Sequence, residues 1–414
     1  MKLPGEYKLL DQIQNTADLI LSDRSIDRII GQDHAVDIVK LASMQRRFLL
    51  IAGEPGTGKS MLGRAAADMM KTNFLNDVIA YENSENKNLP EISIAGAGSA
   101  VKQIQLELKA GRKELFAESF LIYSAMAALA FISGYFSFRD QNFVWIFAAS
   151  IGVYFLWKLR IRLHRNSEMG IPKILVNREP SGKTPFIDAT GSGEGALLGD
   201  VRHDPYQSGG METPPHQLLE AGAIHHADGG VLYIDEISML SRDSQQSLLT
   251  AIQDKKMPIT GRSPGSSGMM IRSEPVPCDF MLVLAGNLED IEKIHPALRS
   301  RIKGYGYEIY TKTSMPVNPK NTEKMIHFIA GEVQNDGRIP HFEKSGIIEI
   351  LNQAVIRARP GFYTLRLREL GGLIRTAGDV AAREKVKFVN ETHVIQALEY
   401  TKSIESAFQE EEEV

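Results

Sequence analysis

Two long apolar runs interrupt the mixed pattern of hydrophobic and polar positions in the middle of the chain. The first extends from Ser119 to Phe138 and the second from Phe143 to Lys158. A helix needs roughly 20 apolar residues to cross a bilayer, and aromatic residues near the ends of the shorter run favour a membrane interface. Because the runs are separated only by Arg139–Asn142, they predict an antiparallel transmembrane hairpin inserted at about residues 119–160.

Basic residues flank this predicted hairpin on both outer sides: Lys109, Arg112 and Lys113 before it, and Lys158, Arg160, Arg162 and Arg165 after it. Since positive residues stay on the cytoplasmic side, we expect a multi-pass protein of the cell membrane with its remaining domains in the cytoplasm. No charged residue lies inside either run, which favours a lipid anchor over an ion pathway. Gly134 and Gly152 would let the helices approach closely. The alternative is a hydrophobic hairpin buried in a soluble core.

Three short apolar runs predict buried strands, and the first leads into a phosphate-binding loop. After Phe48–Ala52 the sequence fits the pattern G-x-x-x-x-G-K-[ST], followed by a helix-forming segment, which is the context that this motif requires. The loop consists of Gly53, Glu54, Pro55, Gly56, Thr57, Gly58, Lys59 and Ser60. We expect its backbone N–H groups to surround the phosphates of ATP, Lys59 to reach the β- and γ-phosphates, and Ser60 to ligate Mg²⁺.

The other two predicted strands end in polar side chains. Asp235 and Glu236 follow Val231–Ile234; we expect Asp235 to hold the Mg²⁺ shell and Glu236 to polarise the attacking water. Asn287 ends the strand that begins at Met281, where it could hydrogen-bond the γ-phosphate or the water, or simply form a turn. Together these residues predict ATP hydrolysis in an α/β domain with a parallel sheet.

Apolar positions recur at helical spacing towards the C-terminus, in residues 321–334, 344–358 and 368–385. The pattern predicts five parts in chain order. They are an N-terminal helical segment (1–28), an α/β core (29–312), the hairpin inserted within it (119–160), a helical lid (313–408) and an acidic tail or linker (409–414).

Composition narrows the possible partners. The net charge is −4, whereas nucleic-acid-binding domains usually carry a basic face, so we do not expect nucleic acid as the partner. The single cysteine, Cys278, excludes an internal disulfide and leaves no thiolate cluster for zinc. The N-terminus has no apolar signal region, so the internal runs would direct membrane insertion.

The motifs taken together resemble the AAA+ ATPases. The shared pattern begins at Ile29-Ile30-Gly31-Gln32, continues through the phosphate loop and Asp235-Glu236, and ends with HPALRSRI from His295. The segments from Leu197, Pro214 and Ile259 are similar to the ATPase module of archaeal, membrane-anchored Lon proteases of the LonB type. That family also carries a membrane hairpin between its two nucleotide-binding motifs, and the resemblance covers nearly all of the chain.

The resemblance implies a homo-oligomeric ring, expected to be a hexamer, with ATP at the subunit boundaries. Arg301 would then be the arginine finger that contacts the neighbour's nucleotide, with Arg299 as the alternative. Arg368 would be a second sensor on the lid, with Arg366 as the alternative. Tyr206, in a glycine-flanked loop, would grip substrate in the pore, and so could a β-hairpin whose tip includes Met269 and Met270.

The implied function is an ATP-driven unfoldase that feeds unfolded or membrane protein chains to a Ser–Lys peptidase. We expect that serine protease domain to begin near residue 414, so the bond broken in this chain would be that of ATP. The alternative is a non-proteolytic remodelling ATPase or a nucleic-acid motor of the related helicase and chelatase group. Only Arg262 and Arg272 flank the predicted pore hairpin, which does not favour the motor.

Overall fold

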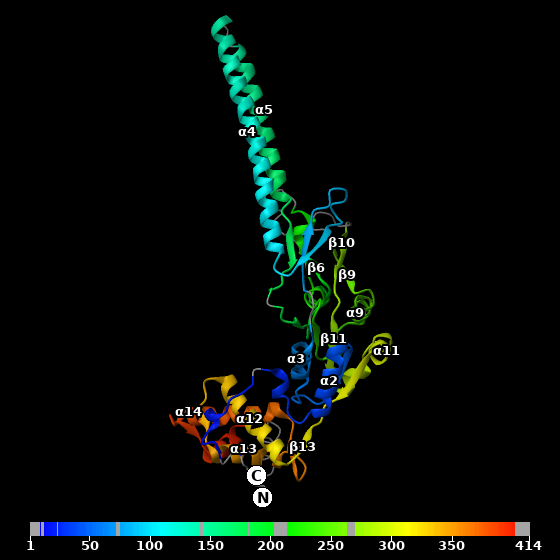
Figure 1. Ribbon diagram of the computed structural model, residues 1–414, viewed down its shortest axis with the longest axis vertical. Helices are drawn as coiled ribbons and strands as arrows, with labels where there is room; N and C mark the ends of the chain where they lie inside the picture. The colour runs from blue at the N-terminus through cyan, green and yellow to red at the C-terminus, as the bar shows by residue number, and fades with distance from the viewer. Residues whose placement is uncertain are drawn as a thin grey trace, which may run out of the picture.

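The computed structural model describes residue 9 and residues 12–22, 24–71, 75–140, 144–180, 182–202, 213–262 and 270–401. Tyr206, Met269 and the acidic tail at 409–414 lie outside these ranges. The molecule is elongated, with the long helical hairpin at one end and the helical lid at the other (Figure 1). The α/β core lies between them.

A five-stranded parallel sheet forms the centre of the core. Its order is β12 (Gly306–Tyr310), β1 (Phe48–Ala52), β11 (Met281–Gly286), β8 (Val231–Ile234) and β5 (Phe186–Asp188). The three strands predicted from apolar runs are therefore the three middle strands. Because parallel strands share one carboxyl edge, the phosphate loop, Asp235 and Asn287 come together at that edge.

Both faces of this sheet are covered, which explains why its middle strands are continuously apolar. Alternate side chains such as Leu49 and Ile51 pack under helices α2 (Asp33–Gln45) and α3 (Lys59–Met69). Leu50 points to the opposite face. That face is covered by α6 (Glu194–Leu198), α8 (Ala223–His226), α9 (Arg242–Asp254) and α11 (Pro296–Tyr305). A short helix, α10 (Leu288–Glu292), follows β11.

A second, smaller module lies between the core sheet and the hairpin (Figure 1). Its antiparallel sheet contains β3 (Glu91–Gly96), β2 (Asn76–Tyr81) and β4 (Lys173–Val176). Two strand pairs and one helix complete it. The pairs are β6 (Asp200–Val201) with β7 (Leu219–Glu220) and β9 (Lys256–Arg262) with β10 (Met270–Pro277), and the helix is α7 (Pro215–Leu218). Val78, Val176, Val201, Ile259 and Ile271 share one apolar cluster, so segments far apart in the sequence form one unit.

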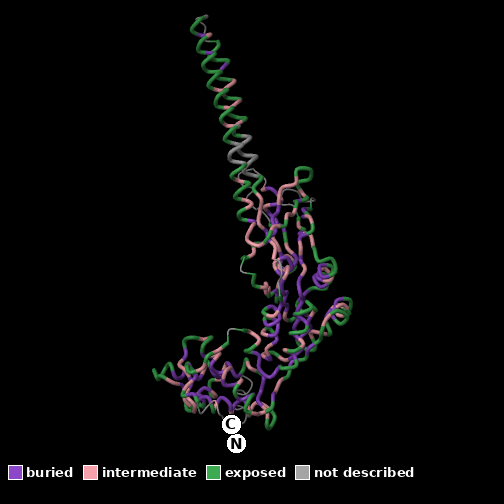
Figure 2. The backbone as a smooth tube through the Cα atoms, in the orientation of Figure 1, coloured by how far each residue is buried: buried purple, intermediate pink, exposed green. Residues whose placement is uncertain are grey.

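Helices α4 (Ala100–Asp140) and α5 (Val144–Met169) form the antiparallel hairpin. Their apolar stretches, Ser119–Arg139 and Val144–Ile161, are long enough to cross a membrane, and only 6% of each is buried. Figure 2 shows the described residues of the hairpin largely exposed, so the alternative of a hairpin buried in a soluble core is wrong. A Cβ added at Gly152 would lie 2.7 Å from the Leu129 side chain, as close packing predicts, whereas one added at Gly134 would meet no atom of the other helix within 4 Å among the described residues.

The C-terminal unit contains α12 (Pro319–Asp336), α13 (Lys344–Ile356), α14 (Leu367–Arg383) and α15 (Glu391–Tyr400). Two short strand pairs join them: β13 (Ser314–Pro316) with β15 (Phe362–Thr364), and β14 (His341–Phe342) with β16 (Phe388–Val389). Local sequence determines where helix α12 begins and ends. The Asn318 side chain caps its first turn, Pro319 starts it, and Gly337 ends it with a φ of +67°.

The described part of the N-terminal segment contains two short 3₁₀ helices, Thr16–Asp18 and Ser25–Arg28. Ile13 and Ile30 are buried with the lid helices in one apolar cluster. The segment therefore packs against the lid, and its chain continues into α2 of the core.

Candidate active site

The phosphate loop joins β1 to α3 in the conformation that its glycines allow. Gly56 and Gly58 have φ values of +80° and +90°, a region that side chains with a Cβ rarely adopt. Lys59 begins α3, so the free N–H groups of the first helical turn face the loop and favour an anion there. The Lys59 ammonium donates hydrogen bonds to the carbonyls of Gly53, at 2.9 Å, and Glu54, at 3.1 Å.

Charged side chains from several elements act on the Lys59 ammonium. Burial lowers the pKa of Lys59 below its usual value, and the positive charge of Arg368 lowers it further. Asp235, Asp290 and Glu236 oppose this shift through their negative charges. The ammonium is therefore close enough to the acidic strand ends and to the lid for all of these charges to act on it.

Asp235 lies at the end of β8 and, with Ser60, lines the same cavity. Its backbone N–H donates to the Thr190 hydroxyl at 2.9 Å, and its carboxylate accepts from the Tyr233 hydroxyl at 3.2 Å. Glu236 follows with a φ of +50° and an exposed side chain. Its N–H donates to Asp235 at 2.9 Å, so the positive φ separates the directions of two successive carboxylates.

The donors at this position suit magnesium. Ser60 and Asp235 offer a hydroxyl and a carboxylate oxygen, which are hard ligands. Among the described residues no group of three or more His, Cys, Asp or Glu side chains could hold a metal ion. Mg²⁺ commonly uses one or two protein oxygens and takes its other ligands from phosphates and water, so these residues fit a nucleotide-bound ion.

Asn287 follows β11 directly and is the N-cap of α10. Its N–H donates to the Asp290 carboxylate at 2.9 Å, and the Ser238 hydroxyl donates to the same carboxylate at 2.7 Å. These two hydrogen bonds lower the pKa of Asp290. Asp290 thus connects the Asn287 turn to the turn after Glu236. Sequence reasoning missed it, although an Asn followed three residues later by an acid is the pattern of a helix cap.

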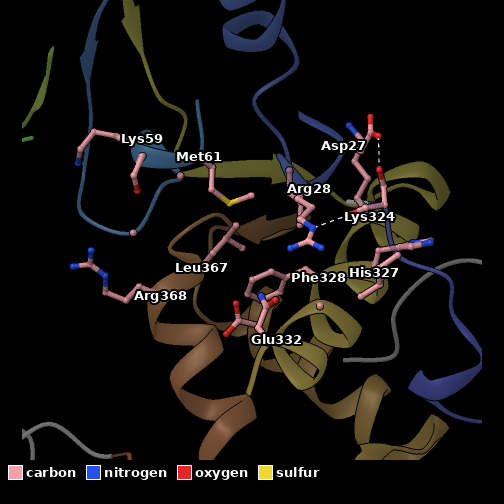
Figure 3. A pocket seen from close by; sticks show the side chains of 18 of the residues that line it. Asp27, Arg28, Lys59, Met61, Lys324, His327, Phe328, Glu332, Leu367 and Arg368 are labelled. Carbon is pink, nitrogen blue, oxygen red and sulfur yellow. Dashed lines mark hydrogen bonds between the residues drawn. The ribbon is translucent and has the colours of Figure 1, made fainter. Parts of the chain in front are cut away.

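A cavity of about 720 Å³ lies between the core and the lid. Figure 3 shows Lys59 from the core and Arg368 from the lid at one side of it, with Phe328 and Glu332 from α12 below. Further lining residues that sequence reasoning did not single out are Asp27, Arg28, Lys324, His327, Leu367 and Arg375. Asp27 and Arg28 belong to the N-terminal segment and the other four to lid helices α12 and α14. The sequence indicated only helical segments there, because lining a cavity depends on tertiary contacts.

The lid joins the phosphate loop directly at the start of α14. The Leu367 N–H donates to the Gly56 carbonyl at 3.1 Å. A Cβ added at Gly56 would lie 2.8 Å from the Cβ of Arg368, so this contact has no room for a side chain. Arg368 lines the cavity, whereas Arg366 forms an ion pair with Glu54 at 2.7 Å.

The two finger candidates lie on α11 and do not line this cavity. Arg299 pairs with Glu308 of the neighbouring strand at 3.2 Å. Arg301 lies over the Tyr305 ring, with 4.2 Å between the guanidinium carbon and the ring centroid. The structure therefore does not bring either arginine together with the phosphate loop of its own chain.

Several known proteins are similar to the chain in sequence. A family model described as LonB-like, AAA domain matches residues 182–297, and one described as Magnesium chelatase, subunit ChlI matches residues 25–100. The archaeal Lon protease of Archaeoglobus fulgidus is 48% identical over 95% of this chain and 62% of its own length. The archaeal Lon protease of Thermococcus kodakarensis is 44% identical over 97% of this chain and 64% of its own length.

A shorter relative matches over nearly its whole length. The putative lon protease homolog of Thermoplasma acidophilum is 32% identical over 97% of this chain and 92% of its own length. The chain thus spans somewhat under two thirds of the two longer relatives and almost all of the shorter one.

Proposed function

The chain belongs to the archaeal Lon protease family, as its motifs predicted, and we propose that it is the ATP-hydrolysing module that unfolds and translocates proteins for a Ser–Lys peptidase. One observation carries the proposal: a single cavity brings together the phosphate loop, Asp235 at the end of β8, and Arg368 of the lid. These groups come from distant parts of the chain, and they are the ones that phosphoryl transfer requires.

The residues act together as follows in this proposal. The loop N–H groups and Lys59 bind the phosphates, and Ser60 and Asp235 would hold Mg²⁺, which would supply positive charge against the phosphates. Glu236, whose side chain is exposed, accepts a proton from the attacking water, and Asn287 orients that water. Arg301 of a neighbouring copy stabilises the charge that develops on the transferred phosphate.

The lid transmits the nucleotide state. Arg368 contacts the γ-phosphate, and α14 is attached to the phosphate loop by the Leu367–Gly56 hydrogen bond and the Arg366–Glu54 ion pair. Any movement of the loop on hydrolysis therefore moves α14 and the lid core behind it. In a homo-oligomeric ring, which we propose to be a hexamer, this motion pulls an unfolded chain through a pore, where Tyr206 grips it.

The hairpin anchors this motor in the cell membrane as a multi-pass protein with the ATPase on the cytoplasmic side. The exposure of both apolar helices supports the anchor, and their basic flanks support the orientation. Membrane lipid and membrane proteins are then natural partners. The chelatase-type and nucleic-acid alternatives are not favoured, because the chelatase model matches only residues 25–100 and the relatives above are Lon proteins.

The test is Glu236→Gln in the whole chain, in detergent. We expect ATP binding close to wild type and turnover slower by about 100-fold or more, because loss of a general base costs roughly that much. Glu391→Gln is the matched control, since Glu391 is an exposed acid on the lid helix α15. Wild-type turnover in Glu236→Gln would contradict the assigned role. Stimulation of the wild type by DNA and not by unfolded protein would contradict the proposed substrate.

A further inference from the structure

Tyr233 carries a hydroxyl in a position where a phenylalanine would fill the same space. Only 1% of Tyr233 is exposed, and the residue belongs to the apolar cluster under α2 and α3. Burying a hydroxyl is destabilising unless it is hydrogen-bonded. This hydroxyl is hydrogen-bonded, and both of its partners are residues that the nucleotide site uses.

The hydrogen bonds have a defined direction. Burial raises the pKa of the Tyr233 hydroxyl well above its ordinary value, so the group stays protonated. The Tyr233 hydroxyl donates a hydrogen bond to the Asp235 carboxylate, with 3.2 Å between the oxygens. Because a tyrosine hydroxyl has one hydrogen and Asp235 accepts it, the tyrosine oxygen can only accept in its hydrogen bond with the Ser60 hydroxyl. The order of donation is therefore Ser60 to Tyr233 to Asp235.

The ring that carries this hydroxyl is fixed on both sides. A Cβ added at Gly63 of α3 would lie 2.5 Å from the Tyr233 ring, so the ring lies directly on the helix backbone. On its other side the Phe186 ring packs with 5.7 Å between centroids. The hydroxyl is consequently held at one point between the start of α3 and the end of β8.

We propose that Tyr233 is a positioning residue for the magnesium ion of the nucleotide site. The Tyr233 hydroxyl accepts a hydrogen bond from Ser60 and so turns the lone pairs of the serine oxygen towards the ion. It donates a hydrogen bond to Asp235 and so fixes the rotamer of that carboxylate. It touches neither nucleotide nor metal. The inference rests on the proposed function, since it assumes that Ser60 and Asp235 act on a nucleotide-bound Mg²⁺.

The experiment compares Tyr233→Phe with wild type in the whole chain, in detergent. Affinity for ADP is measured by titration calorimetry with Mg²⁺ and with EDTA, and the ratio of the two affinities gives the contribution of the metal. We expect this ratio to fall by about 10-fold in Tyr233→Phe, which is the lower end of the effect of losing an outer-shell hydrogen bond to a metal ligand. The affinity in EDTA should be unchanged.

Tyr363→Phe is the matched control. Tyr363 is fully buried in the lid, where its hydroxyl is hydrogen-bonded to Thr322 with 2.9 Å between the oxygens. Both variants remove one buried hydroxyl, so both should lower the melting temperature, but only Tyr233→Phe should change the metal-dependent ratio. A wild-type ratio in Tyr233→Phe would overturn the inference.

The variant Asp235→Asn distinguishes a failure of the Tyr233 positioning role from a failure of the nucleotide site. If it abolishes the metal-dependent gain in affinity while Tyr233→Phe leaves the gain intact, the positioning role is wrong and the nucleotide site stands. If the wild type binds ADP equally with Mg²⁺ and with EDTA, the inference is wrong, and the proposed function itself fails only if the wild type also does not hydrolyse ATP.

Discussion

At the residue scale, the chain holds charges and neutral groups in fixed states by burial and hydrogen bonding. Lys59 and Asp235 could be predicted because a short motif or a strand end fixes their positions locally. Tyr233 and Asp290 could not, because their roles arise from contacts with Ser60 and Asn287 that tertiary structure creates. His225 belongs to the second kind, and it gives the molecule a pH dependence.

His225 is 1% exposed and is held neutral by its surroundings. Its Nδ1 accepts from the Gly222 N–H, and its Nε2 donates to the Met257 carbonyl, both at 3.1 Å. Burial lowers the pKa of His225 from 6.5 to about 4. A second proton would have to sit on Nδ1, against the Gly222 N–H.

We therefore expect stability to fall with acidification. The unfolded chain protonates this histidine near pH 6.5, and the folded protein resists protonation until about pH 4. The contribution is present in full above pH 6.5 and is lost progressively between these values, by roughly 3 kcal/mol in total. Melting temperatures across this range measure it. His225→Gln should flatten the dependence relative to His34→Gln at an exposed site; equal slopes in these two variants would contradict it.

At the element scale, hydrophobic periodicity was sufficient to predict a strand or helix whose buried positions follow one regular pattern. The three middle strands of the core sheet and helices α12 to α14 were predictable because continuous apolar runs and helical spacing leave little choice. The module of β2, β3 and β4 was not predicted. β3 and β4 are only partly buried, and β2 pairs with β4 across the whole insertion, as when Val78 pairs with Val176.

Asp77 of β2 joins the two ends of that insertion. It is fully buried, and its carboxylate accepts from the Ala100 N–H at the start of α4, at 3.0 Å. The other oxygen accepts from the Arg178 N–H just after β4, at 2.7 Å. One side chain therefore fastens both the outgoing and the returning chain of the hairpin to the module below it.

Asp77→Ala should lower the free energy of unfolding by about 2–4 kcal/mol, because it leaves two buried N–H groups without an acceptor. Asp77→Asn keeps one acceptor oxygen and should lose about half as much. Urea unfolding in detergent measures both. Asp37→Ala is the control, since that carboxylate is exposed and pairs with Lys40 three residues along the same helix. A loss no larger than in the control would show that the hairpin ends are held by other contacts.

At the scale of the whole molecule, the nucleotide cavity and the apolar spans are far apart. The cavity lies between core and lid, and the hairpin leaves the opposite end of the core (Figure 1). The apolar span begins only at Ser119, 19 residues after α4 starts, which is about 28 Å of helix at 1.5 Å per residue. Near its base α4 is held by Tyr81, whose hydroxyl donates to Glu107 at 3.0 Å. The ATPase is therefore a complete unit that the hairpin holds at a distance.

This separation predicts that membrane attachment can be removed without loss of ATP hydrolysis. Replacing residues 119–161 by a short Gly/Ser turn removes both apolar spans and keeps the helical stubs that follow Ala100 and precede Lys173. We expect the shortened chain to remain in the supernatant without detergent, because the exposed apolar surface of the hairpin is gone. Its ATPase rate should stay within about twofold of the parent chain, since none of the cavity-lining residues lies in the removed segment.

A matched variant with Lys59→Ala in the same shortened chain should be equally soluble and inactive, which separates solubility from chemistry. Two results would contradict the separation. If the shortened chain still sediments with membranes, another surface binds lipid. If it is soluble and folded but has lost ATP hydrolysis, the spans themselves hold the active site together, through the ring or through the module at the base of the hairpin.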